Sequence, residues 1–561
     1  MNTLRASVRH TLDQLTAPGA PFECVDIDVQ GQRQRAYRHA FPTLQALLQA
    51  ARGHGQKAFI VSDGVTWTFE AVFACADALA ARWQHEQGLH AGDRVAIAMR
   101  NRAEWVIGWV AAVLCGAVPA PLNSFGQRDE LAAALSELRP RILLCDEERF
   151  ARVEGLADVV SLYTLVVGGP AWLQAVSQPA PRRREVAVSP DDAALILYTS
   201  GASSRAKGVL STHRAVCQGL FNIDFIGAFS AATSPQALQR LMARGLAPTT
   251  LTAVPLFHVS GLHAQLMSAL RHGRRLVFMR RWDPAAAVDL IRSHQVTQFN
   301  GAPAMVMQLV AQPGFDELAA TTLGGLGFGG AGLPQRLIDD VLQRMPDSMS
   351  GIGFGMTESN GVGAAVSGAL FVQRPQAAGV PSPIIDIRIE GLAGEALAPG
   401  AQGEICLRGI SLMQAYWAQP EATAQAVREG WLHTGDIGYL DDDGLLHVVD
   451  RIKDVINRHG EKIAAVEVES CLLMHPDVQE VAVFGVPDAT TGEAVAAQVV
   501  LRAGSLANEA ALAHHVAGRL AAYKVPAQWH LGNEPLPRNP AGKLLKRQLR
   551  DAWLSLTGVS R

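Results

Sequence analysis

Short runs of β-branched and other apolar residues alternate with helical patterns between residues 95 and 300. Runs at residues 95–99, 141–145 and 193–198 are typical of buried strands, and residues 102–115 have helical periodicity. Runs at 251–256, 275–279 and 296–300 repeat the pattern, and Asp283-Pro284 supplies an N-cap and a first-turn proline for a helix between them. Strands joined by crossover helices pair in parallel, so the pattern predicts an α/β fold with two sheet layers.

The pattern of predicted elements changes at about Gly379. Strands punctuated by Pro and Gly follow and predict a small β-rich subdomain that ends near Asp450. After Arg451 a compact α+β pattern has strands at residues 479–486 and 495–501 and a helix from about 508 to 521. We therefore predict two domains, residues 1–450 with paired, mostly parallel sheets plus the β subdomain, and residues 451–561 with a small α+β fold.

The balance of charge excludes one class of protein. The 561 residues carry 49 Lys+Arg against 52 Asp+Glu, a net charge of −3, which excludes a polybasic nucleic-acid binder. Hydrophobic residues make up 48% and charged residues 18%, as in globular proteins. Residues 105–122 are uncharged but contain two glycines and two prolines, so we expect a buried helix leading into a strand and no integral membrane segment.

The cysteines and the N-terminus bear on location. Seven cysteines are scattered without paired spacing, unlike a disulfide framework or a zinc site: Cys24, Cys75, Cys115, Cys145, Cys217, Cys406 and Cys471. The first 15 residues lack the apolar core of a signal peptide. We therefore expect a cytoplasmic protein, and the sequence leaves a homodimer open.

A hydroxyl-rich loop follows the apolar run at 193–198. Backbone N–H groups, hydroxyls and one ammonium here can hold a polyphosphate, and glycine permits close approach. The candidate residues are Thr199, Ser200, Gly201, Ser203, Ser204 and Lys207. The loop is not a Walker motif, because Ala206 and Gly208 flank the lysine. Considered alone, it could be a mobile connector.

With further segments in matching order, this loop resembles the phosphate loop of the adenylate-forming superfamily of acyl-CoA synthetases, carrier-protein adenylation domains and luciferases. The family pattern is Thr-Ser-Gly-Thr-Thr-Gly-x-Pro-Lys-Gly, and this chain departs from it at Ala202, Ser204 and Ala206. The resemblance covers almost the whole chain. It implies a large N-terminal platform and a mobile C-terminal lid, with the active site between them.

The segment Phe354-Gly355-Met356-Thr357-Glu358 resembles the family's Tyr-Gly-Met-Thr-Glu. The resemblance implies that Phe354 stacks on adenine, that Thr357 contacts the α-phosphate and that Glu358 holds Mg²⁺. A carboxylate beside a hydroxyl suits a hard cation that bridges phosphates. The alternative is an ordinary helix start capped by Thr357.

Two more segments resemble nucleotide-binding parts of the family. Gly330, Ala331 and Gly332 resemble the loop that approaches the adenine base, with a plain glycine turn as the alternative. Asp436, in Trp-Leu-His-Thr-Gly-Asp, resembles the residue that accepts hydrogen bonds from both ribose hydroxyls. The alternative for Asp436 is an Asx turn.

The junction between the predicted domains also matches. By resemblance Arg451 contacts the ribose and phosphate region, Lys453 is the hinge residue, and Gly460 lines the route of the thiol. His459 stands where the family has a first glycine. A solvated linker is the alternative reading of these charges.

Two residues complete the predicted site. Lys543, in Pro-Ala-Gly-Lys-Leu, resembles the catalytic lysine that bridges the carboxylate and the α-phosphate. His258 resembles the residue that gates the path between the acyl site and the thiol tunnel, and a core histidine is its alternative. Residues 299–303 and 327–329 would then wall the carboxylate pocket.

The resemblance implies an AMP-forming acyl-CoA synthetase for a hydrophobic, fatty or aryl, carboxylic acid. Its cofactors and co-substrates would be ATP, Mg²⁺ and coenzyme A. The closest alternative is an adenylating enzyme that passes the acyl group to a carrier protein or another acceptor. A nucleotide-binding protein without catalysis is a further alternative, whereas a serine hydrolase lacks support because no Gly-x-Ser-x-Gly occurs in the chain.

Overall fold

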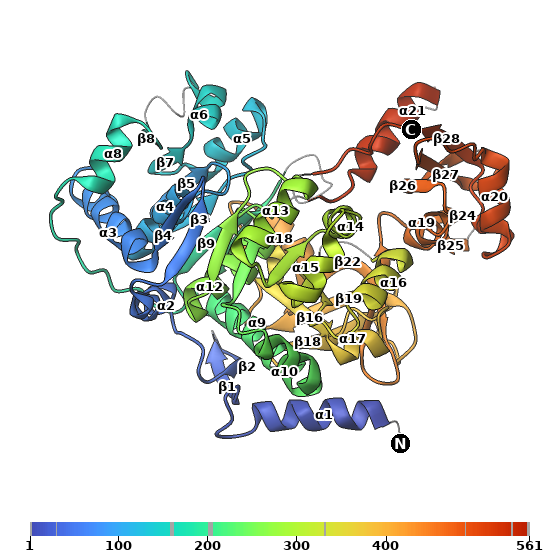
Figure 1. The fold of residues 1–561 in the computed structure, drawn as a ribbon, viewed down its shortest axis with the longest axis horizontal. Coiled ribbons are helices and arrows are strands. Elements are labelled where there is room, and N and C mark those ends of the chain that lie inside the picture. Colours follow the sequence, from blue (N-terminus) through green and yellow to red (C-terminus); the bar gives the residue numbers. More distant parts are fainter. Residues whose placement is uncertain are drawn as a thin grey trace.

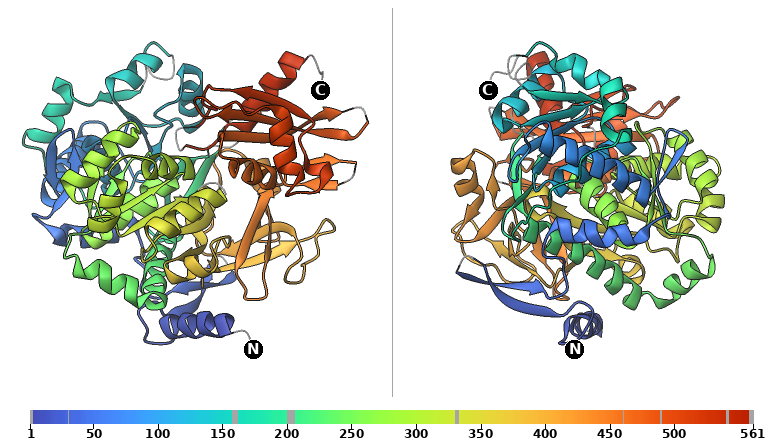
Figure 2. Two further views of the ribbon diagram at one scale, coloured as in Figure 1. Left: turned by 45° about the vertical axis from the view of Figure 1, so that its right-hand side comes forward. Right: turned by 90° about the vertical axis from the view of Figure 1, so that its left-hand side faces the viewer.

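The computed structural model describes residues 3–29, 31–156, 162–199, 206–329, 333–459, 461–488, 490–539 and 542–557. A large N-terminal region carries a smaller C-terminal lobe at one end (Figure 1), and two further views place that lobe against the same end (Figure 2). Helix α1(Thr3–Thr16) and the hairpin β1(Cys24–Val29)–β2(Gln32–Tyr37) lie at the opposite side of the region. The exact boundary at residue 450 stays a prediction.

A nine-stranded sheet forms the centre of the N-terminal region. Its order is β17-β16-β15-β14-β13-β11-β12-β3-β4, parallel from β15 to β3 and antiparallel at both ends. The strands are β3(Ala58–Ser62), β4(Val65–Thr68), β11(Thr249–Thr252), β12(Arg275–Phe278), β13(Gln298–Gly301), β14(Gly325–Gly329), β15(Gly351–Met356), β16(Gly361–Ser367) and β17(Val380–Pro381). The predicted parallel layer is confirmed.

A second parallel sheet has the order β6-β5-β7-β8, and a three-stranded antiparallel sheet has the order β20-β10-β9. Their strands are β5(Arg94–Ala98), β6(Val118–Pro121), β7(Ile142–Cys145), β8(Tyr163–Val166), β9(Ala193–Tyr198), β10(Gly208–Thr212) and β20(Ala415–Tyr416). The predicted pair of sheet layers is therefore present, with the runs at 95–99, 141–145 and 193–198 as strands.

Helices fill the seam between the two parallel sheets. One hydrophobic cluster joins α2(Leu44–Ala51), α3(Phe69–His85), α4(Ala103–Leu114) and α9(His213–Thr233) with strands of both sheets. A short helical run continues this seam as α11(Val259–Gly261), the π-helix η2(Leu262–Met267) and α12(Ser268–His272). Because apolar faces on both sides cover these helices, their burial supplies much of the hydrophobic stabilisation of the platform.

Further helices complete the N-terminal region. They are α5(Arg128–Leu138), α6(Glu147–Val153), α8(Pro170–Ser177), α10(Pro235–Ala243), α13(Pro284–His294), α14(Pro303–Val310), α15(Phe315–Thr321), α16(Gln335–Arg344), α17(Ala369–Gln373) and α18(Pro420–Ala426). The predicted cap of α13 is confirmed, since the Asp283 carboxylate accepts hydrogen bonds from the amides of Ala285 and Ala286, each at 2.9 Å.

One described helix, α9, is long and apolar enough by length and composition to cross a membrane. Of its apolar window 61% is buried inside the molecule, as in a core helix. Residues 105–122 form the buried helix α4 followed by strand β6, as predicted.

The predicted β subdomain is a five-stranded antiparallel sheet, with the order β18-β19-β22-β21 and β23 paired to β22. Its strands are β18(Ile385–Glu390), β19(Gly403–Gly409), β21(Val427–Arg428), β22(Trp431–Leu440) and β23(Leu446–Arg451). The register of β22 and β23 sets Asp436 opposite Arg451. This pairing brings two of the predicted site residues together.

The C-terminal lobe has its own sheet and core. The sheet order is β25-β24-β27-β26, with β28 paired to β27. Its elements are β24(Ile456–Arg458), β25(Glu461–Ile463), α19(Ala465–Leu473), β26(Val478–Asp488), β27(Gly492–Leu501), α20(Glu509–Ala517), β28(Gln528–Gly532) and α21(Lys546–Thr557). The helix predicted to reach residue 521 ends earlier, at Ala517, and Gly518 follows as its C-cap.

All seven cysteines are free thiols. Cys115, Cys145, Cys217, Cys406 and Cys471 are buried, and the other two are half-buried. Burial raises the pKa of each thiol, to about 11 at Cys24. No pair forms a disulfide, in agreement with the scattered spacing.

Candidate functional site

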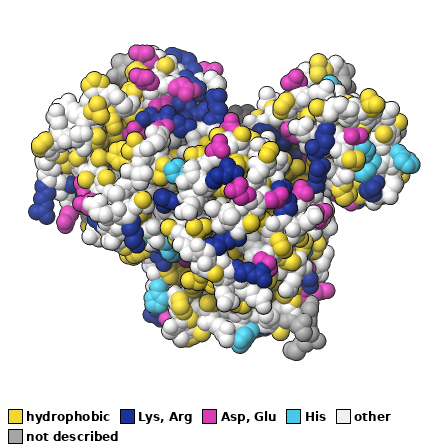
Figure 3. All heavy atoms as spheres, viewed as in Figure 1, with side chains coloured by type: hydrophobic (Ala, Val, Ile, Leu, Met, Phe, Trp, Pro, Cys, Tyr) yellow, Lys and Arg dark blue, Asp and Glu magenta, His cyan; other side chains and the backbone are white. Residues whose placement is uncertain are grey.

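A cavity of about 2760 Å³ lies where the N-terminal region meets the C-terminal lobe. The surface is hollowed between these two parts, and Lys and Arg side chains border the hollow (Figure 3). Every predicted site residue that the structure describes lines the cavity: Thr199, Lys207, His258, Phe354, Gly355, Thr357, Glu358, Asp436, Arg451 and Lys543. The other predicted residues lie outside the described parts of the chain: Ser200, Gly201, Ser203, Ser204, Gly330, Ala331, Gly332 and Gly460.

Asp436 and Arg451 form an ion pair across strands β22 and β23. Arg451 Nε lies 3.1 Å from Asp436 Oδ1, and the Asp436 residue is only 7% exposed. Burial raises the pKa of this carboxyl group, while Arg451 and Lys543 act in the opposite direction. The result is a carboxylate held by cations at the edge of the cavity, with the geometry to accept further hydrogen bonds.

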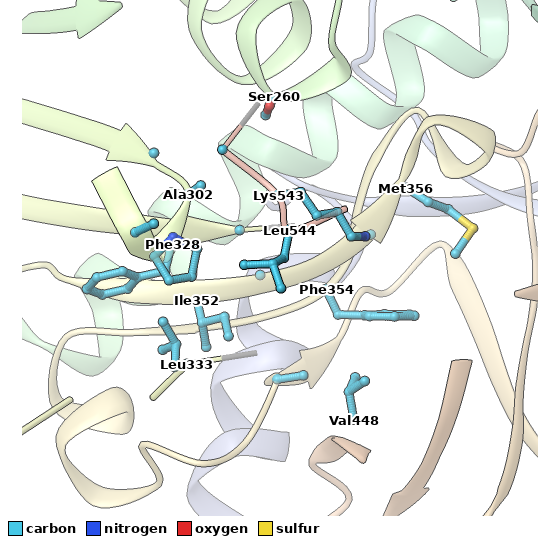
Figure 4. A pocket seen from close by; sticks show the side chains of 18 of the residues that line it. Ser260, Ala302, Phe328, Leu333, Ile352, Phe354, Met356, Val448, Lys543 and Leu544 are labelled. Atoms are coloured by element: carbon cyan, nitrogen blue, oxygen red, sulfur yellow. The ribbon is translucent and has the colours of Figure 1, made fainter. Parts of the chain in front are cut away.

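Lys543 reaches the cavity from a tight turn of the C-terminal lobe. The Asn539 side chain accepts a hydrogen bond from the Lys543 amide at 2.8 Å, and Gly542 takes a positive φ of +83°. Figure 4 shows Lys543 and Leu544 near Ile352 and Phe354, both of strand β15. Burial, reinforced by Arg451, lowers the pKa of Lys543 to about 8.

This turn also fixes how the two parts of the chain meet. A Cβ atom on Gly542 would lie 2.9 Å from the Cβ of Ala302, at the start of α14 in the N-terminal region. Only a residue without a side chain fits at this contact, because its φ is also in the left-handed region. The close approach carries Lys543 to the cavity.

The base of the hydroxyl-rich loop is closed by reciprocal hydrogen bonds. The Thr199 amide donates to the Lys207 carbonyl at 2.9 Å, and the Lys207 amide donates to Thr199 Oγ1 at 3.3 Å. The Lys207 ammonium lies 4.6 Å from the centre of the Tyr416 ring. Strand pairing of β9 and β10 thus holds the predicted phosphate-binding lysine at the cavity wall.

Tyr416 connects this lysine to the predicted metal ligand. Its hydroxyl donates a hydrogen bond of 2.7 Å to Glu358 Oε1, and burial next to Glu358 raises the pKa of the phenol. One carboxylate oxygen of Glu358 is thereby oriented by protein, and the hydroxyl of Thr357 lies next to it in the chain. An oxygen-only donor set of this kind fits Mg²⁺. Thr357 begins a single 3₁₀ turn, Thr357–Ser359, and does not cap a longer helix.

Phe354 and His258 are both fixed by burial. Phe354 lies on β15 with 9% exposure, and Figure 4 shows its ring facing Val448 across the cavity. His258 precedes α11, and burial lowers its pKa to about 4, so the imidazole is neutral. Its Nε2 atom has no hydrogen-bond partner among the described residues. The neutral imidazole of His258 has no proton to spare as a general acid, so its position on the cavity wall fits the predicted role of a gate better.

The backbone at His459 shows why the family has a glycine at this position. His459 adopts φ +52°, the left-handed region, in the turn between β24 and β25. A non-glycine residue pays a steric cost in this region. The segment therefore keeps the glycine-like backbone although the residue differs.

Two residues that contact the predicted site residues or their neighbours were not themselves predicted as site residues. Tyr416 lies in the two-residue strand β20, 58 residues after Glu358, and its role arises only from the pairing of β20 with β10. Asp450 accepts hydrogen bonds from the amides of Arg451 at 2.8 Å and Val466 at 3.2 Å, so it ties β23 to the first turn of α19. A carboxylate at the predicted domain boundary was the only sequence hint for Asp450.

The two-layered platform, the smaller lobe and the lysine that it extends over a cavity with paired acidic and basic groups together define the class of adenylate-forming enzymes. The model of the AMP-binding enzyme family matches residues 47–417, and the model of the AMP-binding enzyme C-terminal domain matches residues 467–543. The chain belongs to the AMP-binding enzyme family.

Several relatives are similar over most of their length. A feruloyl-CoA synthase from Amycolatopsis sp. is 34% identical over 82% of this chain and 89% of its own. The fatty acid–[acyl-carrier-protein] ligase ScoC from Streptomyces coeruleorubidus is 31% identical over 91% of this chain and 97% of its own. The o-succinylbenzoate CoA synthetase from Bacillus subtilis, solved with ATP and magnesium, has a TM-score of 0.74 at 29% identity, covering 90% and 99% of the two chains.

Proposed function

We propose that this protein is an AMP-forming acyl-CoA synthetase that activates a hydrophobic, fatty or aryl, carboxylic acid with ATP and transfers the acyl group to coenzyme A. One observation carries this proposal: Lys543 meets the Asp436–Arg451 pair in a cavity that Thr357 and Glu358 also line. Cations and a buried carboxylate around one space suit a nucleotide whose ribose and phosphates both need partners.

In the first half-reaction a carboxylate oxygen of the acid attacks the α-phosphate of ATP, the bond from that phosphate to the β-phosphate breaks, and pyrophosphate leaves. The Lys543 ammonium would bridge the two anions and offset their repulsion as they approach. Asp436 would accept hydrogen bonds from the ribose hydroxyls, with Arg451 holding the carboxylate in place. Lys207 would neutralise the outer phosphates.

Glu358 and Thr357 would hold a magnesium ion, which supplies charge neutralisation for the phosphate oxygens when it is bound. The Tyr416 hydroxyl fixes the Glu358 carboxylate by its 2.7 Å hydrogen bond. The carboxylate therefore needs little reorganisation to take up a cation.

In the second half-reaction the sulfur of coenzyme A attacks the acyl carbon, AMP leaves, and the thiol proton passes to solvent. We propose that the lobe after residue 450 moves about Lys453 between the two steps, so that water is excluded while the adenylate exists. We also propose a cytoplasmic location, which the scattered cysteines without paired spacing support.

Transfer to a carrier protein is the second candidate, because the relative ScoC is named as an acyl-carrier-protein ligase at 31% identity. The two functions share the first half-reaction and differ only in the acceptor. The two candidate functions are distinguished by which thiol, that of coenzyme A or that of a carrier protein, accepts the acyl group from the adenylate.

The test is a pyrophosphate-release assay of the full-length protein with MgATP, a panel of fatty and aryl acids, and either coenzyme A or a carrier protein bearing phosphopantetheine. We expect acid-dependent pyrophosphate release and a thioester only with coenzyme A. The Lys543→Ala variant should lose release, and Lys462→Ala, an exposed lysine of the same lobe, should keep it. Acyl-adenylate with no thioester of coenzyme A would reject the first candidate, and no release with any acid would reject both.

A further inference from the structure

An inner part of the cavity follows strand β13, from Ala302 after the end of this strand to Gln298 at its start, and helical segments line it as well. Gly227 and Ser230 of α9 line one side of this inner part, and Gln265 of η2 lines another. Gln298 and Asn300 of β13 line the sheet side. We call this inner part the acyl slot.

The floor of the acyl slot carries almost no side chains. Gly327 and Gly329 of β14, and Gly351 and Gly353 of β15, alternate along their strands and line the cavity. A Cβ atom at Gly327 would lie 2.2 Å from Asn300 Oδ1, so a larger residue cannot be placed there without displacing that amide. A bare, flat sheet surface opposite a helix favours a planar occupant.

A chain of hydrogen bonds runs along the sheet side of the slot. Arg274 Nη1 donates to Gln298 Oε1, and Gln298 Nε2 donates to Asn300 Oδ1 at 3.1 Å. Because the Asn300 oxygen is already used, its amide N–H groups are left for the cavity. This chain of hydrogen bonds leaves the side-chain NH₂ group of Asn300 free to donate to a ligand in the slot.

Arg274 itself lines the cavity and has an unused donor. Its Nε atom is buried without a hydrogen-bond partner among the described residues, and no described carboxylate forms an ion pair with it. The neighbouring Asp224 already contacts Arg271 and lies 2.6 Å from His272 Nε2. The inner end of the slot therefore holds two arginines against one carboxylate.

The helical wall adds a second group without a partner. Gln265 is 1% exposed and lines the cavity, yet neither its amide nitrogen nor its amide oxygen has a hydrogen-bond partner among the described residues. It lies on the π-helix η2, a rare geometry that occurs mostly at functional sites. A buried amide destabilises the fold unless a ligand or water satisfies it.

Resting on the function proposed above, we propose that the acid substrate is planar and aromatic and carries an acceptor oxygen at the end distant from the reacting carboxyl group. Arg274 and Asn300 would donate to this oxygen, and Gln265 would bond the same end from the helical wall. Because positive charge is in excess at the inner end, the preferred group that carries this oxygen is a second carboxylate. A hydroxyl is the uncharged group that could accept the same hydrogen bonds.

The experiment compares matched acids by kcat/KM for pyrophosphate release from the full-length protein. Two series of different length, benzoate and cinnamate, are each tested unsubstituted, with a 4-hydroxyl and with a 4-carboxylate. A site built around a polar substituent rejects the analogue that lacks it, so we expect a preference of about 10-fold or more for an oxygen-bearing acid. A higher value for the 4-carboxylate than for the 4-hydroxyl would support the charged form.

Variants locate the preference in the slot. Arg274→Met should reduce kcat/KM for the oxygen-bearing acid by about 10-fold or more and leave the unsubstituted acid unchanged. The matched control is Arg275→Met, because Arg275, the next residue in the chain, begins β12 and donates to Thr249 Oγ1 at 3.2 Å. Gln265→Leu, a second variant of similar shape, should shift the preference in the same direction if Arg274→Met fails to fold.

A wild-type preference for the unsubstituted acid would overturn this inference and leave the proposed function standing. Equal losses for both acids in Arg274→Met would overturn it as well, since they would indicate a structural role only. No pyrophosphate release with any acid would overturn the proposed function and this inference together.

Discussion

The charge of Lys543 depends on its neighbours. Burial and the nearby Arg451 lower the pKa of this lysine to about 8. The ammonium form therefore dominates below about pH 8 and is lost as the pH rises through that value. We predict that kcat/KM for pyrophosphate release declines above about pH 8, because the neutral amine cannot bridge two anions.

The pH profile of Lys543→Arg provides the check on this assignment. A guanidinium stays charged across the range, so its lower activity should show no decline in the same interval. A wild-type profile that stays flat up to pH 9.5 would contradict the role given to Lys543.

Tyr416 allows a test of the cation site that leaves the carboxylate in place. Tyr416→Phe removes the hydroxyl that donates to Glu358 at 2.7 Å. A lost hydrogen bond of about 1 kcal/mol corresponds to about a 5-fold increase in the magnesium concentration at half-maximal rate. Magnesium titration of pyrophosphate release measures this, with Tyr439→Phe as the control because Tyr439 stacks on His447 elsewhere in the β subdomain. An unchanged requirement would mean that Tyr416 only packs against Lys207.

Motif residues could be predicted from sequence because each has a fixed chemical task and fixed neighbours in the chain. Asp436, Arg451 and Lys543 were predicted in this way, and the fold brings them to one cavity. Tyr416 and Arg274 could not be predicted, since each contacts a partner from a distant segment of the chain. Their roles depend on sheet register, which a single sequence does not reveal.

At the scale of elements, Asp450 takes the place of a missing cap. Helix α19 follows Ala464, which has no side chain to accept an amide hydrogen, and Asp450 Oδ2 accepts from Val466 instead. Asp450→Ala should lower the free energy of unfolding of the C-terminal lobe by about 1–3 kcal/mol, because buried amides lose their acceptor. Urea denaturation followed by circular dichroism measures the loss.

The control for this prediction is Asp442→Ala, an exposed aspartate in the turn between β22 and β23. It should change stability by less than about 0.5 kcal/mol. Equal losses in the two variants would show that Asp450 acts through surface charge and not as a remote cap.

Strands were predictable where side chains favour them. The apolar runs that became β5, β7, β9, β12 and β13 contain Val, Ile and Phe, which pack well on a pleated surface. Strands β14 and β15 were not predicted, because alternate positions are glycine and glycine weakens strands. The π-helical turn of η2 likewise has no sequence pattern of its own.

For the whole molecule, the contact between Gly542 and Ala302 controls how the lobe docks. Gly542→Ala would place a Cβ 2.9 Å from that of Ala302, so the docked arrangement would be disfavoured. We predict a loss of about 10-fold in pyrophosphate release, equivalent to about 1.4 kcal/mol. Thioester formation from a synthetic acyl-adenylate and coenzyme A should be affected less, because the lobe moves between the two half-reactions.

Gly504→Ala is the matched control for backbone strain. Gly504 also has a positive φ, +81°, but a Cβ there would meet nothing within 4 Å. Both variants should lose similar stability, whereas only Gly542→Ala should lose adenylation. Equal effects on both half-reactions would argue that the two steps share one arrangement of the lobes.

The buried cysteines have a practical consequence for a protein proposed to handle a free thiol substrate. Disulfide exchange requires a thiolate, and burial keeps the pKa of Cys115, Cys145 and Cys217 near 12. At neutral pH these groups remain protonated and shielded. The oxidised, disulfide form of coenzyme A that accumulates in stored reagents should therefore not react with these buried thiols.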